Sequence, residues 1–101
     1  MKILAVFNLK KGVSPEQARE YLADEERMAW QLYLAGNVRE YYLTQNPGEV
    51  IDVLEYDSLD AARADMEGLP LMRAGLLDAT YYELRPFKNL EFLFDSSNQT
   101  N

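Results

Sequence analysis

The sequence contains no cysteine and no histidine. Without cysteine, neither a disulfide framework nor a thiolate metal site can form. Without histidine, the chain lacks the usual general base, any Ser/His or Cys/His catalytic pair and the commonest transition-metal ligand. We therefore expect no metal site, and any acid–base chemistry must be carried out by Asp, Glu, Tyr or Lys.

Two further absences narrow the function. The chain has no GxGxxG, P-loop or nucleophile-elbow motif, so we expect no nucleotide and no other cofactor. Basic residues are also few, with 10 Lys and Arg against 17 Asp and Glu for a net charge of -7. They occur singly apart from Lys10 and Lys11, whereas nucleic acids and anionic membranes are bound by clustered basic side chains. We expect neither kind of partner.

The first residues, MKILAVFNL, form a short apolar run with a single Lys and no small-residue cleavage site. This pattern favours a β-strand over a signal peptide, and it predicts a cytoplasmic protein.

Turn and cap signals divide the chain into six elements. Ser14, Pro15 and Gln17 form a helix start with a capping box, and Gly36 is a natural stop after a helix running to Ala35. A second, shorter helix is expected to begin at 57–58 and to end near 67, before Gly68 and Pro70. Apolar and β-branched runs predict strands at 2–9, 37–44, 49–56 and 77–85, the middle two joined by the turn 45–48.

The order β-α-β-β-α-β predicts an α+β, ferredoxin-like domain over residues 1–86, with a four-stranded antiparallel sheet. In the first and third strands, apolar residues stand at both odd and even positions and so point to both faces of the sheet. The helices can cover only one of these faces. We therefore expect the second face to be buried against another copy, in a homodimer or higher homo-oligomer.

Residues 87–101 form a C-terminal tail that begins with the apolar run FKNLEFLF. This run fills no predicted core position, so we expect it to contact a neighbouring subunit. Trp30 and Leu34 lie outside the apolar stripe of the first helix. They are interpreted as a contact for the tail or for another subunit.

Glu25 breaks the apolar pattern of the first helix. It lies near the middle of a stripe that must face the core, where an unpaired charge is costly. The functional interpretation is a partly desolvated carboxylate in a cleft between helix and sheet, with a pKa raised toward the operating pH of a proton carrier. The alternative is an ordinary ion at the edge of the stripe, or one paired with an Arg. The stripe consists of Ala18, Tyr21, Leu22, Met28, Ala29 and Leu32.

Three more residues are candidates for substrate binding. Arg39 and Tyr41 are two residues apart in the second strand, so their side chains are expected on the same face of the sheet. If that face is the one covered by helices, both would meet Glu25 in one cavity. The alternative for Arg39 is an exposed side chain on an edge strand. Tyr81 is expected to line a compartment on one face of the last strand. Asp52 interrupts an apolar strand. Its side chain is at least as well explained by a position on the inter-subunit face of the sheet as by a position in the site.

The run ADE at 23–25, followed by Gly36, Arg39 and Leu69-Pro70-Leu71, resembles the muconolactone isomerase family of the dimeric α/β-barrel superfamily. The pattern extends from Ala23 to Pro86. The resemblance implies two sheets packed face to face, a small-molecule cleft between helices and sheet, and isomerase chemistry without a cofactor. The family has a His where Glu40 stands here, and aromatic residues where Val38 and Ala74 stand. Because these are positions that would set specificity, the resemblance supports the fold more strongly than it supports muconolactone as the substrate.

The leading expectation is therefore an isomerase that shifts a proton across a small unsaturated lactone or related oxygenated molecule, with Glu25 as proton carrier. Two alternatives remain: a cofactor-independent monooxygenase of the same superfamily, and a non-catalytic small-molecule-binding or accessory domain.

Overall fold

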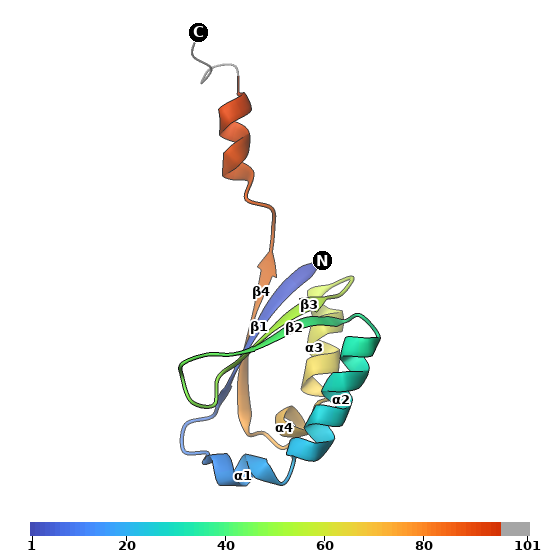
Figure 1. Ribbon diagram of the computed structural model, residues 1–101, viewed down its shortest axis with the longest axis vertical. Helices are drawn as coiled ribbons and strands as arrows, with labels where there is room; N and C mark the ends of the chain where they lie inside the picture. The colour runs from blue at the N-terminus through green and yellow to red at the C-terminus, as the bar shows by residue number, and fades with distance from the viewer. Residues whose placement is uncertain (96–101) are drawn as a thin grey trace.

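The computed structural model describes residues 1–95; residues 96–101, the last part of the predicted tail, lie outside the described residues. The strands form one four-stranded sheet. Figure 1 shows helices packed on one face of this sheet and a C-terminal segment that leaves the body. The elements in chain order are β1 (Lys2–Leu9), α1 (Pro15–Arg19), α2 (Leu22–Leu34), β2 (Val38–Leu43), β3 (Val50–Glu55), α3 (Leu59–Glu67), α4 (Pro70–Arg73), β4 (Leu77–Leu84) and the 3₁₀ helix η1 (Lys88–Phe94).

The strands are arranged in the order β2-β3-β1-β4, and every neighbouring pair is antiparallel. Helices α2 and α3 lie on the same side of the sheet (Figure 1), and α4 contacts both of them. This arrangement confirms the predicted α+β, ferredoxin-like fold. None of the helices within residues 1–95 is long and apolar enough to cross a bilayer.

The predicted caps account for where the helices begin. The backbone N–H of Ser14 donates to Gln17 Oε1 at 2.8 Å, and Ser58 Oγ accepts a hydrogen bond from the backbone N–H of Ala61 at 3.0 Å. After α2, Gly36 takes the left-handed conformation with φ of 82°, as expected for a glycine that ends a helix.

One predicted helix was wrong. The single helix expected from Ser14 to Ala35 is divided into α1 and α2, because the backbone N–H of Tyr21 bonds to the carbonyl of Ala18 in a tighter turn at 3.0 Å. The predicted end of the second helix is confirmed, because α3 ends at Glu67 with Gly68 as its C-cap. Pro70 then lies in the first turn of an additional short helix, α4, that was not predicted, and proline is tolerated there because a helix leaves the first N–H groups without a partner.

The register between strands decides which residues share a face. Ala5 of β1 is paired with Asp52 of β3 and with Tyr81 of β4, so odd residues of β1 lie on the same face as even residues of β3. This is the helix-covered face, and its buried core combines sheet and helix residues. The core consists of Ile3, Ala5, Phe7, Val38, Leu54, Tyr56, Ala62, Met66 and Leu69.

The opposite face of the sheet is also largely apolar. Its central residues are Leu4, Val6, Ile51 and Val53, which are half-buried, and Tyr42 and Tyr82, which are about half exposed. A half-solvated sheet would carry polar side chains at such positions.

Candidate active site

A cavity of about 150 Å³ lies between α2 and the covered face of the sheet. Helix α2 has no fully buried residue, because much of its inner face borders this cavity instead of packing on the sheet. The α2 residues that line it recur every three or four positions, as one helix face requires. The lining is Phe7, Leu22, Glu25, Glu26, Ala29, Leu32, Val38, Tyr41, Val50, Asp52, Met66, Leu69, Leu71 and Met72.

Glu25 lies in the first turn of α2 and is only partly exposed. Its Oε1 accepts a hydrogen bond from the backbone N–H of Leu71 at 2.8 Å. This contact caps the short helix α4, because the residue preceding α4, Leu69, provides no side-chain cap. Burial raises the pKa of the Glu25 carboxyl, the hydrogen bond from Leu71 opposes that shift, and the negative charge of Glu26 adds to it.

Asp52 is the most deeply buried carboxylate of the site, with 5% of its surface exposed. It lies in β3 between Ala5 on one neighbouring strand and Tyr41 on the other. Its Oδ1 is buried and has no hydrogen-bond partner among the residues that the structure describes. Burial, followed by the charges of Glu25 and Glu26, raises the pKa of Asp52 to about 7.

For Asp52, a place on the inter-subunit face was expected at least as much as a place in the site. The structure places this residue on the helix-covered face, between Val50 and Leu54 along β3. The sequence carried no signal for this face, since both parities of the strand are apolar, and the pairing of Asp52 with Ala5 decides it.

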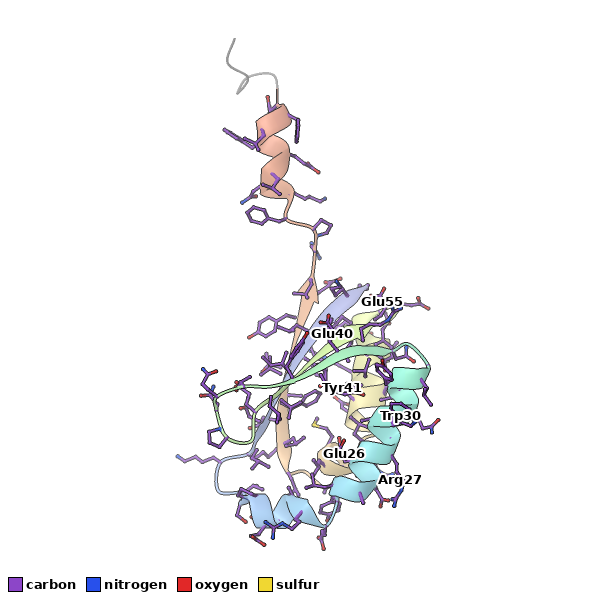
Figure 2. The ribbon with its side chains drawn as sticks, viewed as in Figure 1. Glu26, Arg27, Trp30, Glu40, Tyr41 and Glu55 are labelled. Atoms are coloured by element: carbon purple, nitrogen blue, oxygen red, sulfur yellow. The ribbon has the colours of Figure 1, made fainter. Side chains whose placement is uncertain are left out.

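Tyr41 contributes the wall opposite α2. Its hydroxyl donates a hydrogen bond to the carbonyl of Ala29 at 2.6 Å and so ties β2 to α2. Burial and the nearby charges of Asp52, Glu26 and Glu25 raise the pKa of Tyr41 to about 12, so the phenol stays protonated at neutral pH. Figure 2 shows Tyr41 and Glu26 between β2 and α2, with Arg27 on the outer side of the helix.

Arg39 is not brought to the cavity. A β-bulge between Val38 and Glu40 interrupts the alternation of β2, and Arg39 is exposed, with its Nε donating to the carbonyl of Gly36 at 2.6 Å. The expectation that Arg39 and Tyr41 share one cavity with Glu25 is therefore met for Tyr41 alone. The arrangement matches the alternative of an exposed side chain on an edge strand.

Tyr81 also lies outside the cavity lining. Its ring packs edge-on against Phe7 with centroids 6.4 Å apart, and the guanidinium of Arg63 lies 5.3 Å from its centroid. Its hydroxyl is buried and finds no hydrogen-bond partner within residues 1–95. Burial is the main cause of the raised pKa of this phenol.

The cavity therefore combines apolar walls with three carboxyls, those of Glu25, Glu26 and Asp52, and burial raises the pKa values of Glu25 and Asp52. Asp52, with a pKa of about 7, exchanges protons near neutral pH, and burial disfavours the ionised form of Glu25 as well. Its lining includes no basic side chain, and the part of the chain that the structure describes holds no group of three or more Asp and Glu residues placed to bind a metal ion.

The sequence matches no protein-family model and no curated protein sequence. Among solved structures, the chain is similar to muconolactone isomerase, with a TM-score of 0.72, 21% identity, and coverage of 100% of this chain and 98% of that one. It is similar to 5-chloro-2-hydroxyhydroquinone dehydrochlorinase from Burkholderia phenoliruptrix AC1100 in complex with 2,5-dihydroxybenzoquinone. That match has a TM-score of 0.72 and 17% identity, and covers 88% of this chain and 98% of that one. The chain has the fold of these two enzymes, so the resemblance found in its sequence is confirmed for the fold.

Proposed function

We propose that this protein is a proton-transfer isomerase that acts on a small, unsaturated, oxygenated ring without a cofactor. The observation that carries this proposal is the pair of carboxyls, Glu25 and Asp52, that border one apolar cavity with raised pKa values. Two acidic groups in different environments are the usual means by which a site lacking His divides acid and base roles.

The size of the cavity supports a single ring as the ligand. An apolar cavity of roughly 150 Å³ holds a molecule the size of benzene, and the cavity here is about 150 Å³. Muconolactone isomerase is named for a lactone, and the structurally similar dehydrochlorinase was solved with 2,5-dihydroxybenzoquinone. Both compounds belong to the class of small oxygenated rings that we propose for this chain.

In the proposed reaction, Glu25 takes a proton from a ring carbon next to a carbonyl group and returns it to another carbon of the conjugated system. The hydrogen bond from the Leu71 N–H favours the ionised form of Glu25, which is the form that accepts a proton. Asp52, with its pKa of about 7, supplies a neutral carboxyl in about half of the molecules at neutral pH. That carboxyl donates a hydrogen bond to the carbonyl oxygen as negative charge develops there.

The roles predicted for Arg39 and Tyr81 in substrate binding change in this proposal. Neither side chain lines the cavity, so orientation of the ring depends on Tyr41, Asp52 and the apolar walls.

The direct test is exchange of substrate protons with solvent. We expect that incubation with muconolactone in D₂O introduces deuterium at the carbon next to the carbonyl, because a side-chain carboxyl that carries a proton also exchanges it with water. Proton NMR follows this exchange even when the equilibrium between isomers hides net conversion. The control is Asp24→Asn, which changes an exposed carboxylate of the same helix turn that is paired with Arg27.

Ring binding without deuterium exchange, across a panel of unsaturated lactones and hydroxyquinones, would contradict the isomerase and support a binding domain. Oxygen uptake during turnover, measured with an electrode in the same assay, would instead support the monooxygenase alternative.

We also propose that the open face of the sheet joins two copies of the chain. Its apolar residues, including Leu4, Val6, Ile51 and Val53, are half-buried in one copy, and a specific interface on this face would bury of order 800 Å² per partner. Light scattering at micromolar concentration should give at least twice the mass of one chain. A stable monomer under these conditions would rule the contact out.

A further inference from the structure

The charged groups that line the cavity are all acidic. Glu25 and Glu26 come from α2 and Asp52 comes from β3, and the only other titratable group of the lining is the phenol of Tyr41. Within residues 1–95, no Lys or Arg side chain belongs to this lining. A ligand in the cavity therefore meets carboxyls and apolar walls, and no cation.

The arginines near the site are directed elsewhere. Arginine is the side chain best suited to hold a carboxylate, through paired hydrogen bonds. Arg39 is exposed, and its Nε donates to the carbonyl of Gly36 at 2.6 Å. Arg27 and Arg73 line a different open hollow, between α2 and α4, and Arg27 is paired there with Asp24 at 2.6 Å. Figure 2 shows Arg27 on the outer side of α2. These three guanidinium groups do not line the cavity.

The mouth of the cavity has the same sign of charge. An open hollow of about 600 Å³ adjoins it between α2 and the β2–β3 hairpin, and its only charged side chain within residues 1–95 is Glu26. The two spaces share Glu26, Ala29, Tyr41 and Val50. A ligand that enters from this hollow passes the carboxylate of Glu26.

Asp52 gives the cavity a polar atom that a ligand can pair with. The residue is 5% exposed, and its Oδ1 is buried without a hydrogen-bond partner within residues 1–95. A buried polar atom without a partner is costly, so a ligand that hydrogen-bonds to it gains affinity. The ionised carboxyl accepts a bond from a hydroxyl or an N–H group, and the neutral carboxyl donates one to a carbonyl. An uncharged oxygenated ring can pair with either form, whereas a ligand carboxylate can pair only with the neutral form.

We infer that the ring bound in this cavity is uncharged, so the substrate is a neutral lactone or hydroxylated ring and not a ring that bears a carboxylate. The inference rests on the proposed function for the statement that the bound ring is a substrate. At roughly 6 Å, with the effective dielectric constant of a protein surface, one like charge weakens binding by roughly 100-fold.

The proposed reaction is compatible with this selection. When Glu25 takes up a proton, it loses its negative charge as negative charge develops on the ring. The total charge of cavity and ligand therefore stays constant during the transfer. A carboxylate on the substrate would add a negative charge that no step of the reaction removes.

A pair of ligands with the same shape tests the selection without any turnover. Benzamide and benzoate are both planar rings of similar size, and benzoate carries the additional negative charge. NMR titration measures weak binding, and the backbone amide signal of Leu71 reports on the cavity, because this residue lines it. At pH 8 we expect benzamide to bind and benzoate to bind roughly 100-fold more weakly.

Two variants of α2 show whether the cavity causes the difference. Glu26→Gln removes one carboxylate of the lining, so the affinity for benzoate should rise severalfold while that for benzamide changes little. The matched control is Asp24→Asn, because Asp24 is an exposed carboxylate of the same helix, outside the cavity lining. It should leave the ratio of the two affinities as in wild type.

The dependence of benzoate binding on pH gives a second measurement. The groups that face Asp52 are Glu25 and Glu26 on α2 and Tyr41 on β2, and its pKa is about 7. Between pH 8 and pH 6 the neutral fraction of Asp52 rises from about a tenth to about nine tenths, so benzoate should bind roughly tenfold more tightly at pH 6. Benzamide should bind with similar affinity at both values. In Asp52→Asn most of the gain for benzoate should be lost.

Deuterium exchange then separates this inference from the proposed reaction. Muconolactone bears a carboxylate, and its primary amide is the uncharged compound of the same shape. We expect faster exchange in the amide than in muconolactone when both are present well below saturation. Selective binding of the uncharged compounds with no exchange in either lactone would contradict the reaction and support the charge selection. Exchange in both lactones at equal rates, together with equal binding of benzamide and benzoate, would support the reaction and overturn the inference. Tighter binding of benzoate than of benzamide, or no binding of benzamide at millimolar concentration, would overturn it as well.

Discussion

Replacing Glu25 with Gln should lower turnover by roughly 10²-fold or more, the usual contribution of a positioned acid–base group, and leave the fold intact. The amide has nearly the same shape as the carboxyl, and its oxygen still accepts the hydrogen bond from the Leu71 N–H. It cannot take up a proton from substrate. Steady-state kinetics, with a cyclic compound that shows deuterium exchange as the substrate, measures the fall in turnover. Thermal unfolding of wild type and Glu25→Gln measures the stability of the fold.

The stability of this variant separates a catalytic role from a structural one. If the negative charge of Glu25 holds the fold, Glu25→Gln should be less stable than wild type. If the charge is costly because of burial and the nearby Glu26, the variant should be equally or more stable. Glu25→Ala gives a reference, since it removes the cap of α4 and should cost about 0.5–2 kcal/mol, as lost helix caps do. A marked loss of stability in Glu25→Gln would show that the carboxylate serves the fold, and the proton-carrier role would fail.

The second large effect is expected at Asp52, in the dependence of stability on pH. Its pKa is about 7 in the folded protein and near 3.8 in the unfolded chain, so between these values the folded state binds more protons. Stability should therefore fall as pH rises from about 4 to 7 and then level off. One pKa unit corresponds to about 1.4 kcal/mol, so a shift of about three units gives an upper limit of about 4 kcal/mol.

Asp52→Asn tests this directly, because the amide does not ionise. We expect urea unfolding to give a variant that is more stable than wild type at pH 8, with the difference shrinking toward pH 4. Turnover should fall less than in Glu25→Gln, since the amide still donates a hydrogen bond, and the pH–rate profile should lose its limb near pH 7. A difference in stability between Asp52→Asn and wild type that does not change between pH 4 and 8 would show that Asp52 is not held in the proposed environment. Glu16→Gln, at an exposed ion pair with Arg19, is the matched control.

Much of the fold could be predicted from the sequence because its signals are local. Caps such as Ser14 and Ser58, the helix-ending Gly36 and the turn at 45–48 each act within a few residues, and together they define the order of elements. The interruption of the first helix at Glu20 and Tyr21 was missed because neither residue is a helix breaker. Its origin is a turn of backbone hydrogen bonds that no composition signal marks.

The site could be predicted only in part, because it depends on register between distant strands. Glu25 was found through helical periodicity, a property of one segment. The face of Asp52 is fixed by pairing with Ala5, 47 positions earlier in the chain. Arg39 is exposed, as the alternative interpretation had it, and does not share the cavity with Tyr41, because a bulge shifts the alternation of β2; residues 37–41 carry no glycine or proline that indicates the bulge. The cap that Glu25 provides for α4 could not be foreseen, since α4 itself was not predicted.

That cap has a consequence for motion during turnover. A carboxylate accepts a hydrogen bond more strongly than the neutral acid does, so in the proposed reaction the hydrogen bond from the Leu71 N–H would weaken each time Glu25 took up a proton. The segment that follows, α4 and the turn at Gly75 leading into β4, would loosen at the same moment and tighten again when the proton leaves. Leu71 and Leu69 also line the cavity, so the wall would be most pliant in the half of the cycle when the substrate has lost its proton. The mobility of the cavity wall would then rise and fall in step with proton transfer to and from Glu25.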